Sequence, residues 1–590
     1  MKSFRYIILS LISLVTAACT VGYYGEEDFP MADYVGRTPS LVFDGEDDIE
    51  VGKYGGEYGV TFSANLPWKV SSTVSWIQIL GDNKGLGGDE MLKIKFLVSK
   101  NASINTREGK ICLKVSDDAV SYVTVRQEAM TLEELANDWY VKPGAAGDGS
   151  SWAKAMDLNA ALASCANGDK IHIAAGTYKP EMYAGGTEEG HKTFLVSANV
   201  SLIGGYPAAA KEGDTPDPTA NKVILDGDGK AHHVMVVAAL RDSYFKVEVQ
   251  GLTITNGVGG PVAGSVAMND SRLYASQGSG LSVVNSNAVF RNCEISGNTA
   301  TKGTAGAIVH ESDASFIGCV ISNNTGAANA PGFWSSAGNV VLDGCVLSGN
   351  VTTSGVAGGL YCLDAANSKR TTNTYVYSCF ISGNATDASK YSRRGGGAYL
   401  REGSNTVMVN TTISGNKGAN GGGIATYQVD GAPCNLVLIS CTVTDNESTA
   451  TCGGIESGAG VTTKIYNTIV SGNSDVSGAA DIAVTDVSGN AVAGEIPSTL
   501  EYSINGGTVY GASGAVVSGG FAPSTMFGTL TGGVYPLVGA DNPALTMGMT
   551  SADLLDITTG FTPEMDMTYL GRDQKGNDRI GKVMGAYVGK

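Results

Sequence analysis

The chain has 590 residues, of which 57 are Asp or Glu and 39 are Lys or Arg, so its formal net charge is −18. This acidic balance argues against nucleic acid or another polyanion as a partner, and it suits a soluble, secreted or surface-displayed protein. Glycine makes up 81 residues, about twice the usual share, whereas aromatic residues make up 7%. Length and glycine content together favour a turn-rich β solenoid over one compact domain.

The N-terminal segment has the pattern of a secretion signal. A short basic start precedes an apolar run at residues 6–15 that is too short to span a bilayer comfortably. The sequence Thr16-Ala-Ala-Cys19 follows and resembles a lipobox, with Thr16 where Leu is usual. The resemblance implies a lipoprotein signal peptide at residues 1–18, cleavage before Cys19 and lipid attachment at Cys19. The alternative is an ordinary signal peptide that is cut after Ala18.

Residues 19–40 are polar and acidic and contain two prolines, so we expect a flexible tether. The acidic stretch Glu26-Glu27-Asp28 resembles the surface-export signals of Bacteroidota lipoproteins. These resemblances imply a lipid-anchored protein of the outer membrane that is exposed on the cell surface.

The first folded domain is expected at residues 41–129. About seven short runs alternate apolar and polar residues at period two, which predicts a β-sandwich. The order of five landmarks resembles the BACON domain of Bacteroidota surface proteins. The landmarks are Asn65-Leu-Pro-Trp68, Ser75-Trp76-Ile77, Asn101-Ala-Ser103, Arg107-Glu-Gly109 and Val123-Thr-Val-Arg-Gln127. The resemblance implies a domain that binds carbohydrate or acts as a spacer in a protein that handles glycans or mucin.

Two tryptophans of this domain, Trp68 and Trp76, allow two interpretations. They belong either to the sandwich core or to an exposed platform for sugar rings. We favour the core, because a sugar platform would need both rings to be exposed.

Two short helical segments are expected around the start of the solenoid. The linker at residues 130–138 contains Thr131-Leu-Glu-Glu-Leu-Ala-Asn-Asp138, which predicts one or two helical turns. Apolar residues from Trp152 to Cys165 recur at helical spacing and predict an amphipathic helix. That helix would cover the strand edges at the N-terminal end of a solenoid that we place at residues 139–590.

A seven-residue phrase repeats through the middle of the chain. Its first copy is Asn292-Cys-Glu-Ile-Ser-Gly-Asn298, and six further copies begin at residues 318, 344, 378, 410, 440 and 467. Each copy ends in Asn, and these Asn residues are spaced from 26 (298 to 324) to 34 residues apart (350 to 384). A period of this size with strand-like residues indicates stacked coils.

The phrase can be interpreted position by position. Its first residue is always Asn, Gly or Ser, which predicts a turn. Its second and fourth residues alternate with more variable ones, which predicts a strand with those two positions facing inward. A Gly-Gly-apolar group such as Gly422-Gly-Ile424 precedes most copies and lets neighbouring coils approach closely. Stacked final Asn residues would form a ladder of side-chain amides.

The second position of the phrase is Cys in five copies and Thr in two, at Thr411 and Thr468. Thr cannot complete a disulfide, and no His or acidic residue stands in register with this column. We therefore expect a buried ladder of small side chains and no metal site. The alternative is a metal or disulfide ladder.

These repeats resemble the right-handed parallel β-helix of the pectate-lyase-like class. The Gly-Gly-Ile and Ile-Ser-Gly-Asn elements also resemble repeats of chlamydial polymorphic outer-membrane proteins. The resemblance implies an all-β chain, with an N-terminal β-sandwich followed by a right-handed parallel β-helix solenoid that has a short N-terminal capping helix. Residues 474–550 are expected to form irregular last coils, and the segment 573–587 resembles the closing segment of bacterial surface β-helix proteins.

No catalytic constellation can be identified. A polysaccharide lyase needs an Arg or Lys base beside acidic calcium ligands, and a glycosidase needs paired carboxylates. The outward column two residues before the Cys/Thr column contains one acid, Asp343, among seven residues. Adjacent His232 and His233 would face opposite sides of a strand and could not share a metal. No cofactor is expected, and calcium would be implied only for a lyase.

A binding surface is better supported. Trp334, Tyr361 and Tyr399 stand at the same position of successive coils and predict an outward aromatic strip that stacks on sugar rings. Longer turns nearby carry polar residues that would bond hydroxyl groups or a carboxylate. The polar candidates are Asp364, Lys390, Tyr391, Arg393, Arg394, Arg401 and Glu402. The alternative is that the aromatic side chains pack beneath the inserted turns.

The sequence thus predicts a cell-surface lipoprotein that displays a β-helix for glycan binding or adhesion, without a recognisable catalytic site. Its expected partners are a polysaccharide or glycoprotein glycan, and the outer membrane through the lipid. One alternative is a polysaccharide lyase or glycoside hydrolase that acts on host or dietary polysaccharide. Another is a purely structural stalk.

Overall fold

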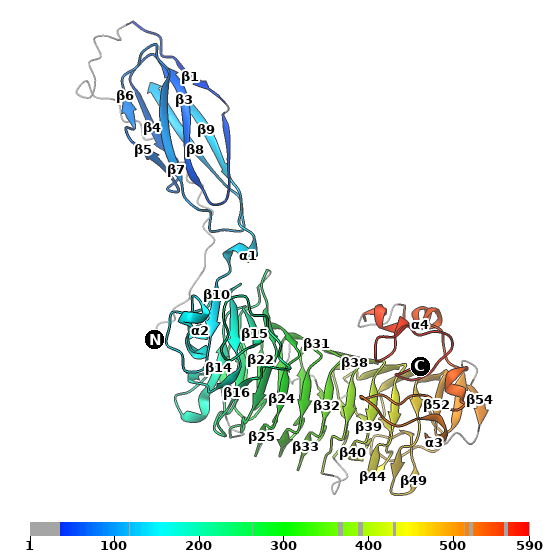
Figure 1. Cartoon of the computed structure of the whole chain (residues 1–590). Helices are drawn as coiled ribbons and strands as arrows, with labels where there is room; N and C mark the ends of the chain where they lie inside the picture. The colour runs from blue at the N-terminus through cyan, green and yellow to red at the C-terminus, as the bar shows by residue number, and fades with distance from the viewer. Residues whose placement is uncertain are drawn as a thin grey trace. The chain divides into compact units, whose positions relative to one another are not determined.

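The structure is a computed structural model that describes residues 36–588, apart from 46, 117–118, 243, 262–263, 302, 364–369, 388–392, 429–431, 512–513, 519–522 and 560–564. The predicted lipid site Cys19, the signal peptide 1–18 and most of the tether lie outside the described residues. The chain divides into two units, Met1–Ala136 and Asn137–Lys590, and each has its own apolar core (Figure 1). Among the described residues, no helix is long and apolar enough to cross a membrane.

The first unit is a β-sandwich. Its four-stranded sheet has the order β1 (Leu41–Asp44), β3 (Gly56–Ala64), β7 (Leu92–Val98) and β5 (Ile77–Leu80). Its five-stranded sheet has the order β2 (Asp48–Val51), β9 (Ala119–Gln127), β8 (Arg107–Ser116), β4 (Trp68–Ser72) and β6 (Lys84–Gly85). Alternate residues of β3, β7 and β8 point into the space between the sheets, which gives the buried and exposed alternation of their sequences. The helix α1 (Leu132–Leu135) follows, and Thr131 and Glu134 close its start as a capping box.

Trp68 and Trp76 of this unit are packed against neighbouring side chains. Trp68 is 7% exposed, and its ring meets the edge of Phe62 at a centroid distance of 5.2 Å. Trp76 is half-buried, and the guanidinium of Arg107 lies 4.3 Å from its ring centroid. The preferred interpretation of Trp68 as a core residue is therefore confirmed.

The second unit is a parallel β-helix with three long sheets, as the repeats predicted (Figure 1). The first sheet runs β10 (Asp138–Val141), β11 (Lys170–Ala174), β15 (Ser201–Tyr206), β18 (Val247–Gln250), β23 (Asn287–Arg291), β27 (Asp313–Ile317), β31 (Gly338–Asp343), β35 (Thr372–Tyr377), β38 (Ser404–Val409), β42 (Asn435–Ile439), β46 (Thr462–Tyr466) and β51 (Thr499–Glu501). The second sheet runs β12 (Gly176–Tyr178), β16 (Val223–Asp226), β19 (Leu252–Thr255), β24 (Glu294–Ser296), β28 (Val320–Ser322), β32 (Val346–Ser348), β36 (Phe380–Ser382), β39 (Thr412–Ser414), β43 (Thr442–Thr444), β47 (Ile469–Val470), β52 (Ser503–Asn505), β53 (Thr508–Gly511) and β54 (Gly514–Ser518).

The third sheet runs β13 (Met182–Tyr183), β14 (Lys192–Val196), β17 (Met235–Val237), β22 (Leu281–Val284), β26 (Ala307–His310), β30 (Phe333–Ser336), β34 (Leu360–Cys362), β37 (Ala398–Leu400), β41 (Ile424–Thr426), β45 (Ile455–Ser457) and β50 (Ile482–Val484). Smaller strips are β20 (Ser265–Met268) with β21 (Ser271–Tyr274), β25 (Thr299–Ala300) with β29 (Thr325–Gly326) and β33 (Val351–Thr352), and β40 (Lys417–Asn420) with β44 (Glu447–Thr451), β48 (Ser474–Asp475) and β49 (Gly478–Ala479). One coil contributes one strand to each long sheet, so equivalent residues of successive coils stack in columns.

The N-terminal end of the solenoid carries two short helical segments where one helix was expected. These are η2 (Trp152–Lys154) and α2 (Leu158–Ser164). The break has a local cause, because Asp157 is extended and its side chain accepts from the N–H of Asn159 as the cap of α2. The buried side chains of Leu158 and Leu162 belong to the solenoid core.

The turn and the inward-facing positions of the repeated phrase are confirmed by the structure. The first residue of every phrase has positive φ, from 50° at Asn292 to 61° at Gly318. The second and fourth residues are buried, and the rings of Phe290 and Phe316, three residues before the Cys column, stack with centroids 4.6 Å apart. The ten described cysteines are free, and nine of them are buried. No disulfide therefore forms among the described cysteines.

The final Asn residues form a buried ladder. Each donates its side-chain amide to Oδ1 of the Asn in the next coil, at 2.8 to 3.0 Å, from Asn298 to Asn473. The backbone N–H of Asn298 and of the other donors bonds the same Oδ1, which fixes the direction of the ladder. The last acceptor is a carboxylate, because Asn473 donates to Asp481 at 2.8 Å. We call this column the inner Asn ladder.

The C-terminal segment leaves the solenoid and folds back over it, which the sequence did not indicate. It contains α3 (Pro523–Met526), η4 (Pro543–Leu545), α4 (Ser551–Thr558) and η5 (Met567–Gly571). Leu554 and Leu570 pack on outward apolar residues of the first sheet, including Tyr377 and Ile439. Figure 1 shows α4 beside the C-terminal strands of this sheet.

Polar contacts fix this segment to the turn columns. Gln574 accepts from the hydroxyl of Thr412 at 2.6 Å and donates to the carbonyl of Cys379 at 2.9 Å. The buried guanidinium of Arg579 donates to Oδ1 of Asn410 at 3.0 Å, and Asn467 donates to the carbonyl of Val583 at 2.9 Å. The Asn side chains of two turns therefore serve as docking points for the end of the chain.

Candidate carbohydrate-binding surfaces

The predicted aromatic strip exists, but most of it is covered. Trp334, Tyr361 and Tyr399 are paired in register on β30, β34 and β37, and the rings of Tyr361 and Tyr399 stack at 5.8 Å. Tyr361 is 0% exposed and Tyr399 is 5% exposed, whereas Trp334 is half-buried. The expectation of an open aromatic face is therefore wrong for the two tyrosines.

The cover comes from residues outside the repeat. Small turn residues, Ala330 and Ala357, pack with these rings, and Leu363 and Tyr427 add larger apolar side chains. Burial raises the pKa of the Tyr399 hydroxyl. The two tyrosines are therefore packed within the protein, whereas the inserted turns at 364–369 and 388–392 lie outside the described residues.

The charged candidates near the stack are engaged with one another. Arg401 pairs with Glu402 at 2.9 Å and donates to the hydroxyl of Tyr361 at 3.4 Å. Arg394 forms a buried ion pair with Glu456, and its guanidinium lies 4.7 Å from the ring centroid of Tyr427. Burial raises the pKa of Glu456, although Arg394 opposes that shift.

The structure thus brings Tyr361, Tyr399 and Arg394, which are buried, together with the half-buried Arg401. Arg393 precedes Arg394, and its buried Nε has no hydrogen-bond partner among the described residues. The remaining candidates, Asp364, Lys390 and Tyr391, lie outside the described residues.

A groove lies elsewhere, on the outer face of the first sheet. It holds about 250 Å³ and spans four strands, β11, β15, β18 and β23. We call it the outer groove. Its lining residues are Lys170, Ser201, Leu202, Ile203, Glu248, Val249, Gln250 and Arg291.

The floor of the outer groove is an ordered array of polar side chains. Lys170, Ser201 and Glu248 are register partners on successive strands, and Gln250 pairs with Arg291 in a second column. Neighbouring strands lie about 4.8 Å apart, so the donors and acceptors repeat at that interval. Gln250 and Arg291 make no side-chain hydrogen bond within the described part of the chain, and Arg291 is exposed.

The outer face of the first sheet is divided in two. The column of Arg291 continues through Ile317 to Asp343 and then to apolar Tyr377, where the C-terminal segment covers it. Burial raises the pKa of Asp343. The open part is therefore the N-terminal part, which contains the outer groove.

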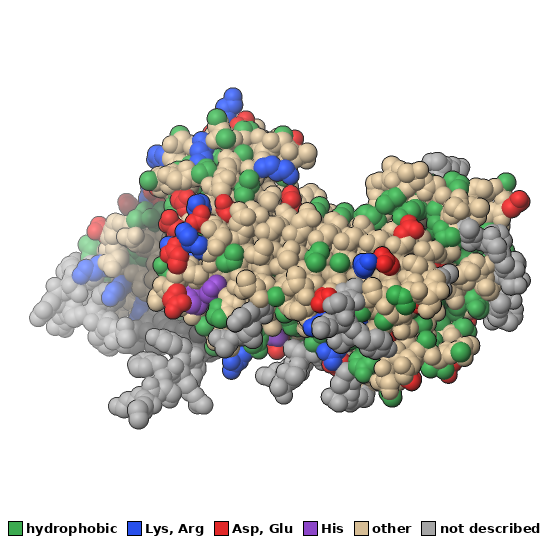
Figure 2. Space-filling model, turned by 90° about the horizontal axis from the view of Figure 1, so that it is seen from below, with side chains coloured by type: hydrophobic (Ala, Val, Ile, Leu, Met, Phe, Trp, Pro, Cys, Tyr) green, Lys and Arg blue, Asp and Glu red, His purple; other side chains and the backbone are tan. Residues whose placement is uncertain are grey.

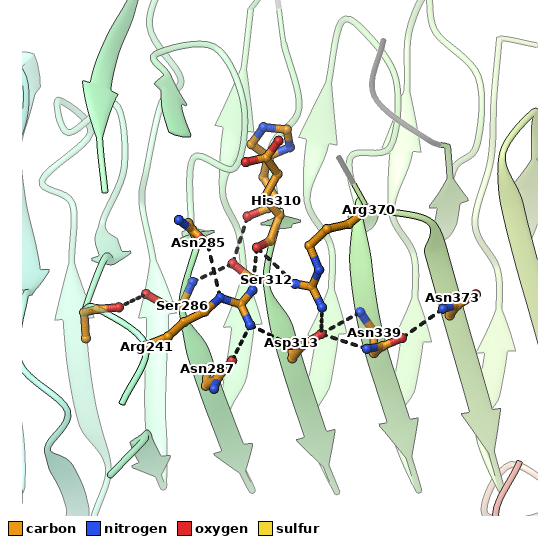
Figure 3. A network of polar contacts seen from close by, with 12 residues as sticks. Arg241, Asn285, Ser286, Asn287, His310, Ser312, Asp313, Asn339, Arg370 and Asn373 are labelled. Atoms are coloured by element: carbon orange, nitrogen blue, oxygen red, sulfur yellow. Dashed lines mark hydrogen bonds and ion pairs between the residues drawn. The ribbon is translucent and has the colours of Figure 1, made fainter. Parts of the chain in front are cut away.

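A polar network borders this face at the starts of the strands (Figure 3). The carboxylate of Asp313 accepts from Arg241 at 2.6 Å and from Arg370 at 2.5 Å. Both guanidiniums also donate to the carbonyl of Glu311, which has a φ of 49°. Burial disfavours the charged form of Asp313, yet the two arginines hold its pKa below the usual value. Each arginine thus connects the turn at Glu311 to Asp313 at the start of β27.

Asp313 also ends a second column of amides. Asn339 donates to Asp313 at 3.0 Å, and Asn373 donates to Asn339 at 2.9 Å. Asn405 and Asn435 continue the column at 2.9 and 2.7 Å. In this outer Asn ladder each amide donates to the preceding coil, so it runs in the opposite direction to the inner Asn ladder.

The sequence contains patterns from which both the outer Asn ladder and the outer groove could have been predicted. The residues of the outer Asn ladder stand five positions before the phrase in successive copies, as at 339 before 344 and 373 before 378. The groove residues lie mostly in coils without the phrase, yet Lys170-Ile-His172 and Glu248-Val-Gln250 alternate polar and apolar residues as outward and inward positions. Aligning those coils to the later ones would have placed the polar columns.

Few acidic side chains lie at the outer groove. Among the described residues that line it, Glu248 is the single carboxylate. Arg291 is separated from Asp343 by two strand spacings, or about 10 Å. A glycosidase would need two carboxylates across the substrate. In the described part of the chain, no group of three or more His, Cys, Asp or Glu side chains is arranged to hold a metal ion.

No protein-family model matches this chain, and no curated protein matches it in sequence. Among solved structures, it is similar to pectate lyase Pel9A, with 13% identity and a TM-score of 0.40 over 77% of this chain and 97% of that one. It is also similar to a Bacteroides ovatus GH5 xyloglucanase in complex with a XXXG heptasaccharide, with 15% identity and a TM-score of 0.15 over 43% of this chain and 46% of that one.

Proposed function

We propose that this protein binds a polysaccharide along the outer groove and does not cleave it. The observation that supports this most directly is the open, ordered floor of polar side chains on a rigid sheet. Rigid strands hold the donors and acceptors in place before binding, so little ordering entropy is lost when a chain of sugars docks.

The charge of the groove suits such a ligand. Lys170, Arg291 and Glu248 give a local formal charge of +1 (two cations and one anion) in a chain of −18. Lysine and arginine donate to hydroxyls and carboxylates, whereas Gln250 and Glu248 supply acceptors. The groove therefore suits sugar residues with free hydroxyls, with or without a carboxylate.

We test the proposal with the double variant Gln250→Ala, Arg291→Ala. Binding to an immobilised panel of neutral and acidic polysaccharides should fall at least tenfold, with an unchanged melting temperature because both side chains are on the surface. The matched control is Lys417→Ala, Glu447→Ala, which removes an exposed ion pair of 2.9 Å on another part of the solenoid. Equal binding by the wild type and the Gln250, Arg291 variant across the panel would reject the groove.

The same panel separates a binder from an enzyme. We measure new reducing ends and the absorbance of unsaturated uronates after long incubation. If the wild type forms either product and the Gln250, Arg291 double variant does not, the protein is a lyase or hydrolase, and the proposal of a binding protein is rejected.

We further propose that the protein is a lipoprotein, anchored through Cys19 and exposed on the outer membrane, with the first unit as a BACON-like spacer. The segment before Cys19 and the acidic tether support the anchor. The buried Trp68 supports a spacer over a sugar platform. Labelling with radioactive palmitate should be lost in Cys19→Ser, and protease added to intact cells should remove the solenoid. Labelling that persists in Cys19→Ser would reject the anchor.

A further inference from the structure

A second polar pocket lies at the edge between the second and third sheets. It holds about 150 Å³ and shares no lining residue with the outer groove. We call it the edge pocket. Its lining residues are Lys179, Pro180, Glu181, Glu189, Lys192, Gly227, Asp228, Lys230 and Ala231. Pockets for drug-sized ligands are about 300–1,000 Å³, so this one suits a single ring.

Charges of both signs meet in this pocket. Lys179 and Lys230 place their ammonium groups 2.5 and 2.8 Å from the carboxylate of Asp228, and Lys192 lies 3.1 Å from Glu189. With Glu181, the pocket has three cations and three anions, so its formal charge is zero. Figure 2 shows basic, acidic and histidine side chains lying side by side in one area of the face it displays.

Asp228 is held in an uncommon backbone conformation. Its φ is 56°, in the turn that follows β16, and its side chain accepts from two lysines that come from different coils. Asp adopts positive φ more readily than most residues, so this turn is compatible with a carboxylate at the position that meets both lysines.

An exposed aromatic ring stands beside the pocket. Tyr183 is 46% exposed, and it is the register partner of Lys192 on the antiparallel pair of β13 and β14. Partners in such a pair share a face, so the ring lies on the side from which Lys192 enters the pocket. The ammonium of Lys192 is 6.0 Å from the centroid of the Tyr183 ring.

Two histidines lie next to the pocket. His232 follows the lining residue Ala231, and its ring meets that of His191 edge-on at 5.1 Å. Burial and the proximity of His191 lower the pKa of His232. A positive charge on His232 is therefore disfavoured beside the pocket.

From this geometry we infer that the edge pocket binds one neutral sugar residue, as a second site apart from the outer groove. A free anion would meet three carboxylates, and a free cation would meet three ammonium groups. A sugar hydroxyl accepts from an ammonium and donates to a carboxylate at the same time, so neighbouring hydroxyls match the pairs of Asp228 with Lys179 and Lys230. Tyr183 offers the apolar face on which the ring would lie. This inference does not depend on the outer groove.

The inference is tested on the full chain by saturation-transfer NMR. The probes are methyl glycosides of neutral hexoses, with a methyl glucuronide and glucosamine as charged analogues. At least one neutral glycoside should bind saturably, and Tyr183→Ala should weaken that binding at least tenfold whereas Tyr183→Phe retains it. Asp228→Ala should weaken it similarly.

Two controls separate the outcomes. Tyr244→Ala removes a tyrosine that is 63% exposed in the loop before β18 and should have no effect. The Gln250, Arg291 double variant should also leave this binding unchanged, so the groove and the edge pocket can fail separately. The inference is overturned if no neutral glycoside saturates, if Tyr183→Ala and Tyr244→Ala behave alike, or if the glucuronide binds more tightly than every neutral probe.

Discussion

Replacing one Asn of the inner Asn ladder should destabilise the solenoid far more than replacing an Asn of the outer Asn ladder. Asn384 and Asn373 belong to the same coil, and each donates to one ladder neighbour and accepts from another. Asn384 is 0% exposed, whereas Asn373 is half-buried. The pair therefore tests how burial changes the free energy of the same interaction.

The magnitude follows from the contacts that Asn384→Ala removes. The amide of Asn384 donates to the carbonyl of Leu347 at 2.9 Å and to Asn416 at 3.0 Å. Its Oδ1 accepts from the backbone N–H of Asn350 at 3.1 Å and from the side-chain amide of Asn350 at 2.9 Å. Those two donors would remain buried without a partner, at about 1–3 kcal/mol each. We expect Asn384→Ala to cost about 4 kcal/mol, and Asn373→Ala to cost less than about 1 kcal/mol because water replaces its partners.

Hydrogen exchange is the suitable assay, because long repeat arrays do not always unfold in one step. Peptides that cover β32, β36 and β39 should lose protection by about 4 kcal/mol of opening free energy in Asn384→Ala, and hardly change in Asn373→Ala. Equal losses in the two variants would refute the argument that burial of the unpaired donors sets the cost.

Three further outcomes are expected. Arg394→Met should lower the free energy of unfolding in urea by about 3–5 kcal/mol, because it leaves Glu456 buried and unpaired. The double variant Arg394→Met, Glu456→Leu should lose less stability. A double variant that is no more stable than Arg394→Met alone would contradict this explanation. Burial lowers the pKa of His233 to about 4 from 6.5, so the unfolded chain takes up a proton that the folded chain refuses, and stability should fall by about 3 kcal/mol as the pH falls from 6.5 towards 4. His233→Phe should remove that part of the slope, and an unchanged slope would assign it to other groups. Gln574→Ala should speed limited proteolysis within residues 523–588 while the rest of the solenoid stays resistant, and cleavage at the wild-type rate would show that the apolar contacts hold this segment alone.

The repeating columns could be predicted because each depends on residue types at fixed positions. A turn with positive φ needs Asn, Gly or a small polar residue, and each phrase begins with one, from Asn292 to Asn467. An amide that bonds its own copy in the next coil needs only a constant register, so the inner Asn ladder follows from the spacing of Asn298 and its equivalents.

The exposure of the aromatic strip could not be predicted in the same way. The positions of Tyr361 and Tyr399 in the coil follow from the repeat, and they are correct. Their burial depends on Leu363, Tyr427 and other residues in segments that do not repeat. The position of a residue in the repeat determines whether its side chain points inward or outward. It does not determine whether another segment of the chain covers that side chain.

The C-terminal segment was missed for a related reason. Its sequence has no repeating pattern of residue types. Its contacts with Thr412 and Asn410 join residues more than 160 positions apart in the chain. The prediction of one helix from Trp152 to Cys165 was wrong for a local reason. The apolar spacing continues through the break between the two segments, where Ala155 ends η2 and Asp157 caps α2.

The two Asn ladders determine how this solenoid can change in length. Each ends at a carboxylate, Asp313 for the outer ladder and Asp481 for the inner, and the two are directed oppositely along the axis. Every coil between these ends presents the same acceptor on one side and the same donor on the other. A coil that carries both Asn residues can therefore be duplicated or deleted as a unit, since its neighbours meet identical groups before and after the change. The molecule can lengthen in steps of one strand spacing, about 4.8 Å, while the outer groove and the edge pocket, which lie in earlier coils, stay intact.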